Sequence, residues 1–462
     1  MTVFGLDESH VRELVTGVSA VQKGDLDDRE VADRFARAAW SVITEPGDGT
    51  AGALVAERGA AEALRFALRD AQSSRATDQS TRATEGAPES LPRSGTPGGL
   101  SDTPRGPDGP AAGAAEETSQ LKAGLDRWRP RMRSGDVERA LLLAARVGAR
   151  MLVPGTDRGT WPSGADDLGP HAPIALWARG DATLLAEERP GVALVGARAA
   201  TGYGEHIAGE ASAGLVDLGY AIVSGAAYGV DGMAHRAALA AGGLTLAFLA
   251  GGVDRFYPAG HDDLLRRITE HGLVLSELPC GAAPTKWRFL QRNRLIAACS
   301  DATVVVEAGA RSGSLNTAGH ASSLGRPLGA FPGPVTSPAS AGCHRLLREY
   351  DAVCVTNARE IAELVGRPSV IAVAAAGADS DGAARDHQST GRSAAGDNGP
   401  RDSPETVRVL DALATRVSRT PGDIAARSGL AVGAVIGVLG TLEVEGRVRD
   451  DAAGWRAVPR RA

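Results

Sequence analysis

The stretch that decides the fold is GVALVGARAATGYGEHIAGEASAGLVDLGYAIVSGA, residues 191–226. It begins and ends with short runs that are apolar throughout, 191–197 and 220–226, and a segment with a helical pattern lies between them. Strands that are apolar on both faces are typical of a parallel sheet covered by helices on both sides. The stretch therefore predicts a strand, a helix and a second strand of the doubly wound kind.

The same alternation continues along the chain. Helical patterns, for example at 231–243, separate four further apolar runs, which lie at 244–252, 273–277, 302–309 and 327–333. We expect an α/β fold: a doubly wound Rossmann-like parallel sheet with a small helical N-terminal domain and a C-terminal winged-helix-like domain. Any ligand site should lie outside the carboxyl ends of the strands.

Changes in composition along the 462 residues predict the domain boundaries. Large apolar residues are almost absent from 73–120 and from a second polar segment near the C-terminus, so neither offsets the entropy cost of ordering. The expected organisation is a helical domain at 1–72, a disordered insertion at 73–120, a helical continuation at 121–148, the Rossmann-like domain at 149–370, a linker at 371–403 and the winged-helix-like domain at 404–462.

The C-terminal segment has the order helix, helix, helix, hairpin, which is typical of a winged helix. Its expected recognition helix, 431–446, carries no Arg or Lys before Arg447. A winged helix that reads DNA normally has cations in that helix. We therefore favour a protein-contact or structural role for this domain.

The composition restricts the classes of partner. Lys and Arg number 50 against 56 Asp and Glu, a net charge of -6, so any nucleic-acid site must be a local patch of cations. The four cysteines form no CxxC pair, which indicates buried free thiols in a reducing compartment and no zinc site. No apolar run approaches the roughly 20 residues of a membrane helix, so we expect a cytoplasmic protein without a membrane segment.

Signatures of common enzymes are missing from the sequence. There is no GxxxxGK[ST], GxSxG or HExxH motif, and the turn at 195–206 lacks the GxGxxG spacing of dinucleotide-binding folds. Arg198 in that turn would obstruct a pyrophosphate, but at a helix N-terminus with free N–H groups it would suit a phosphate reached from outside. Asp231 and His235 could form an acid–base pair, although a cap under a turn is the interpretation we favour. We expect no catalytic residues, no metal and no cofactor.

Two further turns follow predicted strands and have the composition of anion-binding nests. The turn at 224–235 begins with Ser224 and Gly225, and the turn at 307–320 contains the stretch SGSLNT, residues 312–317. One such turn is routine in an α/β protein, but three at one sheet edge indicate a phosphate-binding surface.

The block KWRFLQRNR, residues 286–294, should reach the same edge. Cations can engage phosphates while aromatic and guanidinium planes stack on unpaired bases, which is the mixture that single-stranded nucleic acid requires. The alternative is that Trp287 and Phe289 belong to the core and the arginines form ion pairs with Glu277 and Glu307. Both interpretations stay open from the block alone.

Longer motifs resemble those of one family. They are VALVGARAATGYG, SGAAYGVDGMAH, LAGGVDRFYPAGHDDL, SELPCGAAP, SAGCHRLL and the stretch from Phe289 to Val335 that contains QRNR and EAGARSGSLNTAG. Over about residues 140–365 the chain resembles the DNA-processing protein A family (DprA, also called Smf). More loosely, the N-terminal helices resemble that family's sterile-alpha-motif-like domain, and the C-terminal segment resembles its winged-helix domain.

The resemblance implies a non-catalytic recombination mediator. Such a protein binds single-stranded DNA, forms a homodimer and helps load the RecA recombinase onto DNA, in natural transformation or recombinational repair. With the turns described above, it implies these DNA-binding residues: Arg198, Thr201, Ser224, Gly225, Tyr228, Lys286, Phe289, Arg292, Asn293, Arg294, Ser312, Gly313, Ser314 and Thr317.

Two positions depart from the family pattern. Tyr228 stands where the family usually has a basic residue, and His344 where it often has Asn.

The alternative function is a nucleotide phosphoribohydrolase on a related Rossmann-like scaffold, whose P-G-G-x-G-T-x-x-E turn supplies a catalytic glutamate. Here the corresponding turn, within 307–320, lacks the downstream Glu, and Glu307 precedes it. We therefore favour the DNA-binding function.

Overall fold

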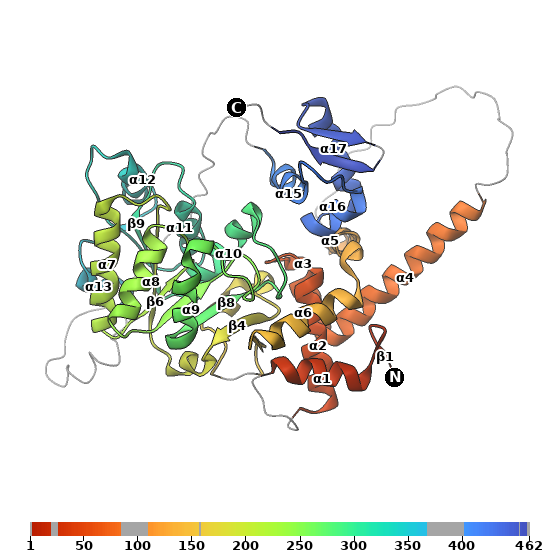
Figure 1. Ribbon diagram of the computed structural model, residues 1–462, viewed down its shortest axis with the longest axis horizontal. Coiled ribbons are helices and arrows are strands. Elements are labelled where there is room, and N and C mark those ends of the chain that lie inside the picture. Colours follow the sequence, from red (N-terminus) through yellow and green to blue (C-terminus); the bar gives the residue numbers. More distant parts are fainter. Residues whose placement is uncertain are drawn as a thin grey trace.

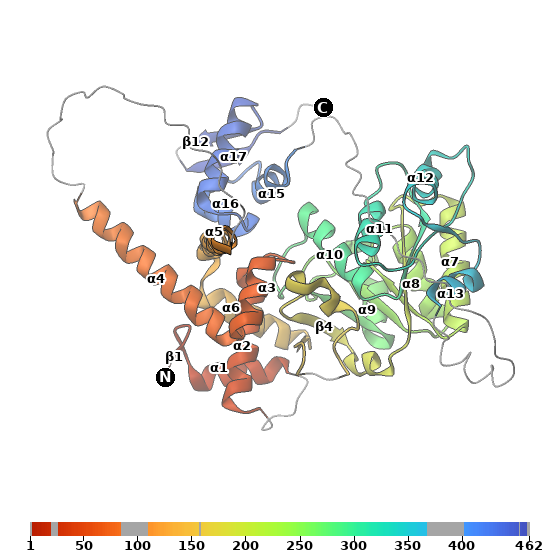
Figure 2. The ribbon, with the colours of Figure 1, turned by 180° about the vertical axis from the view of Figure 1, so that it is seen from behind.

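The computed structural model describes residues 2–19, 26–84, 110–156, 159–366, 402–451 and 453–459. An α/β body forms one end of the molecule, N-terminal helices form the other, and a small C-terminal unit lies beside α5 (Figure 1). From behind, the same C-terminal unit again lies next to α5 and away from α7 and α13 (Figure 2).

A nine-stranded sheet forms the body, and its order is β11-β10-β9-β5-β6-β7-β8-β4-β3. All neighbouring strands are parallel except β4, which pairs antiparallel with both β8 and β3. The strands are β3 (Arg150–Leu152), β4 (Leu176–Gly180), β5 (Gly191–Gly196), β6 (Ala221–Ser224), β7 (Thr245–Phe248), β8 (Leu273–Ser276), β9 (Ala302–Glu307), β10 (Leu328–Ala330) and β11 (Val353–Cys354). The predicted doubly wound sheet is confirmed.

Helices cover both faces of this sheet, which is why the strands are apolar throughout. On β5, Val192 and Leu194 pack with α7 and α8, while Ala193 and Val195 belong to the core shared with α10 and α11. The helices of the body are α7 (Gly202–Asp217), α8 (Val230–Ala240), α9 (Asp262–His271), α10 (Lys286–Ala298), α11 (Ser314–Ser323), α12 (Ala341–Glu349) and α13 (Ala358–Val365). Short 3-10 helices lie at Ala165–His171, Ala182–Glu187, Ala259–His261 and Pro338–Ser340.

The strand order reverses at β5. From β5 the chain adds β6, β7 and β8 on one side, and β9, β10 and β11 later extend the sheet on the other. In open α/β sheets the crevice at such a reversal is where ligands bind. It lies here between the carboxyl ends of β5 and β9.

The N-terminal domain is a helical bundle preceded by a hairpin of β1 (Thr2–Val3) and β2 (Leu6–Asp7). Asp27 and Glu30 form a capping box at the start of α2, and the rings of Trp40 and Trp128 meet edge to face at 5.0 Å. Its helices are α1 (Glu8–Val18), α2 (Asp28–Ile43), α3 (Gly49–Arg58), α4 (Ala60–Thr84), α5 (Pro110–Trp128), the 3-10 helix η1 (Arg129–Arg131) and α6 (Ser134–Arg146).

The predicted disordered insertion at 73–120 is wrong at both of its ends. Helix α4 continues to Thr84, and α5 begins at Pro110. Residues 60–84 contain neither Gly nor Pro, so nothing in the local sequence ends the helix where large apolar residues stop. Residues 85–109 lie outside the described residues, as does nearly all of the predicted linker at 371–403.

The C-terminal domain has the predicted winged-helix order: α15 (Pro404–Ala412), α16 (Pro421–Ser428), α17 (Val432–Val444), and a hairpin of β12 (Val448–Asp451) and β13 (Gly454–Ala457). Ile424, Val435 and Leu439 are fully buried in its core. Among the described residues, no helix taken singly meets the length and hydropathy requirements of a membrane span; α16 and α17, bent by 106°, meet them only as a pair.

The expectation for the cysteines is only partly right. All four are free thiols, and Cys280, Cys299 and Cys343 are buried, but Cys354 is exposed. It lies on β11, the short strand at one edge of the sheet, which among the described strands pairs only with β10.

Candidate nucleic-acid interface

The turn after β5 carries Arg198 at its tip. The guanidinium carbon of Arg198 lies 4.7 Å from the centroid of the Phe289 ring, and the Arg198 side chain is exposed. Thr201 ends the turn and caps α7, where its Oγ1 accepts a hydrogen bond from the amide of Gly204. Arg198 is therefore a solvent-accessible cation held over an aromatic face.

Glu307, the last residue of β9, binds the turn that follows β5. Its carboxylate accepts hydrogen bonds from the Thr201 amide at 2.8 Å and the Thr201 hydroxyl at 2.6 Å, and it is 1% exposed. A methyl group on Gly204 would collide with it. The expectation of free N–H groups at the start of α7 is thus wrong for Thr201, because a carboxylate of the protein already occupies that anion position. A nucleotide pyrophosphate placed there would be repelled.

The turn after β6 is held from below by buried polar groups. Ser224 is fully buried, and its hydroxyl donates to the Leu194 carbonyl at 2.6 Å. Asp231 accepts from the amides of Gly225 at 3.2 Å and Ala227 at 3.4 Å. Ala226, with φ of 53°, adopts the left-handed conformation that side chains seldom take. These contacts fix the turn, and they leave Ser224 away from solvent.

Arg292 lies beneath the same turn and is 5% exposed. Its Nη1 donates to the Gly225 carbonyl at 2.6 Å and also to the Phe248 carbonyl, which ties α10 to the ends of β6 and β7. Any side chain at Gly225 would collide with this guanidinium. Burial lowers the pKa of Arg292 to about 10, although Asp231 opposes the shift, so Arg292 stays a cation at neutral pH.

Aromatic rings gather around Phe289. The Tyr257 ring lies 5.6 Å from it and is 49% exposed, and the Arg292 guanidinium lies 5.9 Å from the Phe289 centroid. Tyr228 is equally exposed; its hydroxyl accepts from the Gly260 amide, and its ring packs edge-on against His261. Tyr257 was not predicted. An aromatic residue in the loop DRFYPAGH, directly after a strand, was the available signal.

The turn before α11 completes the surface. The Asn293 side-chain amide donates to Asn316 Oδ1 at 3.2 Å and to the Gly313 carbonyl at 3.5 Å. The hydroxyls of Ser312 and Ser314 lie 2.7 Å apart. We name the resulting surface the rim; its accessible members are Arg198, Tyr228, Tyr257, Phe289, Asn293, Ser312 and Gly313, and its buried members, behind them, are Gly225, Arg292 and Ser314. Thr317 is 2% exposed and faces the sheet.

Arg294 does not lie at the rim. It is 4% exposed, forms an ion pair with Glu277 at 2.7 Å and donates to the His171 carbonyl at 2.9 Å. Gly47 of the helical domain packs against its guanidinium. The ion-pair interpretation therefore holds for Arg294, whereas Glu307, within the described residues, binds Thr201 and forms no ion pair with an arginine.

The first residues of α10 face the C-terminal domain. The Lys286 amide donates to Asp411 of α15 at 2.8 Å, with the Lys286 side chain exposed, and the Arg408 guanidinium lies 5.3 Å from the Trp287 ring. Successive residues of a helix differ in direction by about 100°. The side chains of 286–294 therefore meet three different surroundings: the C-terminal domain, the rim, and the pair of Glu277 and His171. Only the middle of this block, Phe289, Arg292 and Asn293, reaches the rim.

We expect Arg294→Lys to lower the free energy of unfolding by roughly 1.5 kcal/mol, because an ammonium cannot bind Glu277 and His171 with the geometry of a guanidinium. Urea unfolding measures this change. Affinity of the folded variant for oligo(dT) should be unchanged, and a selective loss of affinity would place Arg294 in the DNA site instead.

Asp231 and His235 have structural partners. His235 is fully buried, with Nδ1 2.7 Å from Thr245 Oγ1, and burial, reinforced by His261 and Arg292, lowers its pKa to about 3. Burial raises the pKa of Asp231, although Arg292 opposes the shift. The favoured interpretation, a cap region packed under a turn, agrees with these contacts.

Comparisons with known proteins find two matching family models and several related proteins. A family described as DNA recombination-mediator protein A matches residues 153–366, and a DprA winged helix domain matches residues 393–454. A DNA processing protein DprA of Mycobacterium tuberculosis is 45% identical over 70% of this chain and 81% of its own length. DprA of Streptococcus pneumoniae is 32% identical over 55% of this chain and 90% of the solved one, with a TM-score of 0.44. DprA of Helicobacter pylori, whose structure concerns a single-stranded DNA binding mode, is 30% identical over 46% and 94%, with a TM-score of 0.42.

Proposed function

The chain belongs to the DNA recombination-mediator protein A family, and we propose on that premise that it binds single-stranded DNA along the rim and leaves the strand uncut. The bound strand is then passed to the RecA recombinase. The observation that carries the proposal is the exposed Arg198 guanidinium stacked on Phe289 beside the half-exposed Tyr257.

The chemistry of this group of side chains favours unpaired bases. In a duplex the faces of the bases are covered by their neighbours, whereas an unpaired base can stack on an aromatic ring or a guanidinium plane. Arg198 can also bind a backbone phosphate, and the Gly313 amide and the Ser312 hydroxyl of the turn at 312–314 are further donors. The buried Arg292 holds two strand ends together and adds positive potential under this surface.

The absence of a catalytic role is part of the proposal. Each buried carboxylate near the rim is engaged by the protein: Glu307 by Thr201, and Asp231 by the amides of Gly225 and Ala227. A phosphoribohydrolase needs a free carboxylate after its phosphate-binding turn, and no Asp or Glu follows Glu307 in the turn at 307–320. The hydrolase alternative is therefore not favoured.

The proposal extends to a homodimer that works in the cytoplasm, in natural transformation or recombinational repair. Family membership supports this extension. Its test is RecA filament formation on DNA that is covered by a single-strand binding protein: addition of the chain should shorten the lag before filaments form. An unchanged lag would contradict the loading role and would leave the DNA-binding role to be judged separately.

Binding of fluorescent oligo(dT) should be tighter than binding of duplex DNA and should weaken steeply with salt. Each phosphate neutralised on a single strand contributes about -0.7 to the slope of log affinity against log salt. Fluorescence anisotropy at several salt concentrations measures both properties. A preference for duplex, or an affinity that is insensitive to salt, would contradict the proposal, and release of adenine from AMP in parallel samples would favour the hydrolase.

A further inference from the structure

A cleft of about 530 Å³ lies where the helical domain, α10 and the C-terminal domain meet. Its lining includes seven arginines and four carboxylates, which leaves a formal surplus of three positive charges. This surplus is unexpected in a chain whose net charge is -6. The cleft is separate from the rim, although both border α10.

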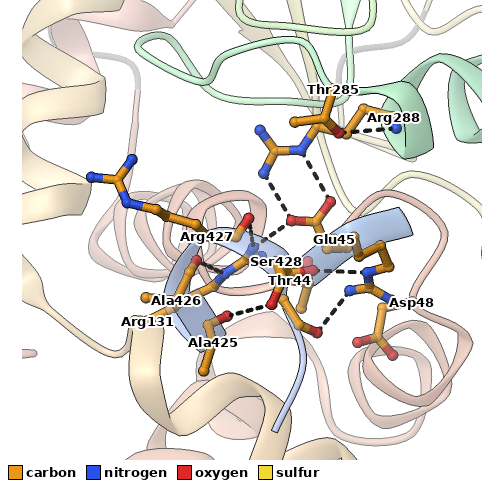
Figure 3. A network of polar contacts seen from close by, with 12 residues as sticks. Thr44, Glu45, Asp48, Arg131, Thr285, Arg288, Ala425, Ala426, Arg427 and Ser428 are labelled. Carbon is orange, nitrogen blue, oxygen red and sulfur yellow. Dashed lines mark hydrogen bonds and ion pairs between the residues drawn. The ribbon is translucent and has the colours of Figure 1, made fainter. Parts of the chain in front are cut away.

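Glu45 lines the cleft and lies in a network of polar contacts with Arg288 and Arg131 (Figure 3). Its carboxylate accepts from Arg288 Nε at 3.1 Å and Nη2 at 2.8 Å, and also from Arg131 Nη2. Arg131 donates further to the Ala426 carbonyl at 2.6 Å, at the C-terminal end of α16. One carboxylate therefore faces two largely buried guanidinium groups, and one of their two positive charges lacks a formal counter-charge.

Arg408, which also lines the cleft, adds a second positive charge without a formal counter-charge. Its guanidinium donates to the carbonyls of Ser428 and Gly429, both at 2.8 Å, and stacks on Trp287. These partners carry only partial charges, from the C-terminal end of α16. Burial lowers the pKa of Arg408; Glu45 opposes the shift, and neighbouring arginines add to it.

The walls of the cleft carry further cations. In the described parts of the chain, no carboxylate forms an ion pair with Arg133, Arg419 or Arg427. Arg133 and Arg427 are exposed, and they come from the helical domain and the C-terminal domain. Two of the lining carboxylates are already engaged, Asp411 by the Lys286 amide and Asp423 by Thr420.

We propose that this cleft is a second anion-binding site, which takes the phosphate groups of a ligand between the helical and C-terminal domains. A cleft lined by one sign of charge concentrates the electric field inside it, and guanidinium groups match phosphate geometry. Its volume lies within the range of small-molecule sites, roughly 300–1,000 Å³. The phosphates belong either to a free nucleotide or to the continuation of a DNA strand bound at the rim, since the two sites lie on the same helix.

The test uses the full chain with Arg133→Glu and Arg427→Glu combined, because within the described residues neither exposed side chain forms an ion pair that its loss would break. Arg267→Glu with Arg348→Glu is the matched control: it makes the same change in charge at exposed positions away from the cleft. Urea unfolding verifies that both variants fold. Should the cleft variant fail to fold, Arg133→Gln with Arg427→Gln replaces it.

The probes are inorganic pyrophosphate, ATP, and oligo(dT) of about 6 and about 30 nucleotides, titrated by calorimetry or anisotropy. Loss of pyrophosphate binding by roughly tenfold or more in the cleft variant, but not in the control, supports the site. If binding of the long oligonucleotide is lost as well, the phosphates come from DNA. If binding of ATP is lost but binding of the long oligonucleotide is not, they come from a free nucleotide. Equal binding of all probes by the variant and the control would overturn the proposal.

The short oligonucleotide separates this site from the rim. We expect so short a strand to be held by the rim alone, so the cleft variant should bind it as the unmodified chain does. Failure of the unmodified chain to bind it would contradict the rim as the DNA site and would leave the pyrophosphate result to decide the cleft.

Discussion

Arg198→Glu combined with Phe289→Ala is expected to weaken oligo(dT) binding by roughly 100-fold, or about 3 kcal/mol. The aromatic substitution removes the stacking surface, which contributes about 1–3 kcal/mol for each base. The charge reversal replaces an exposed guanidinium, held 4.7 Å above that ring, with a group that repels phosphate. Fluorescence anisotropy at low salt gives the ratio of the dissociation constants.

The matched control for this prediction is Arg267→Glu with Leu290→Ala. It reverses one exposed charge on α9 and removes one exposed apolar side chain from α10, outside the rim. The control should change the affinity by less than about twofold, because surface charges outside the site act only through the general field. Equal losses in both variants would mean that net charge, and not the rim, determines binding.

Glu45→Gln is expected to lower the free energy of unfolding by roughly 3–5 kcal/mol. The substitution keeps the shape of the side chain and removes its charge, which leaves the buried guanidinium groups of Arg131 and Arg288 facing each other without a counter-ion. Because these arginines join the helical domain, α10 and α16, the C-terminal domain should detach first. Urea unfolding followed by circular dichroism measures the change, and a separate early transition would report the detachment.

The same carboxylate makes stability depend on pH. Burial raises the pKa of Glu45, but Arg288 and Arg131 outweigh it and lower the pKa to about 2, from an ordinary value of 4.5. Since the folded-state pKa is depressed, the contribution of Glu45 is complete above about pH 4.5 and is lost as the pH falls toward about 2. In Glu45→Gln this acid-dependent loss should be smaller than in the unmodified chain.

Glu270→Gln is the control for both measurements. Glu270 is exposed at the end of α9, and its substitution should change the unfolding free energy by less than about 0.5 kcal/mol. If Glu45→Gln unfolds like this control at neutral pH, the buried arginines must be compensated by other groups, and the account of the domain junction would be wrong.

Much of the fold was predictable because it depends on local patterns. The runs at 191–197 and 220–226 became β5 and β6 with α7 between them, since strands that are apolar on both faces require cover on both faces. The predicted disordered insertion was wrong at its start: beyond residue 72, α4 continues to Thr84 without large apolar residues. Absence of a hydrophobic pattern removes a reason for packing, but it does not remove helix propensity.

The candidate site was predictable only in part, and Arg292 and Arg294 illustrate why. They are two residues apart and chemically identical, yet one supports the rim under Gly225 and the other pairs with Glu277 behind it. Spacing along a helix states the difference in direction between two side chains, but not which neighbour each one meets. For the same reason Tyr257 was missed and Glu307 was expected to pair with an arginine although it binds Thr201, since both act through contacts with residues distant in the sequence.

The amino-acid sequence by itself determined the doubly wound sheet, the winged-helix order and the edge at which the glycine-rich turns meet, because apolar period and turn chemistry act over a few residues. Only the tertiary structure decided which cations face solvent, that a carboxylate occupies the start of α7, and that the C-terminal domain closes an arginine-lined cleft against α10. Burial and ion pairing depend on which distant segments come into contact, and that is settled only when the whole chain packs.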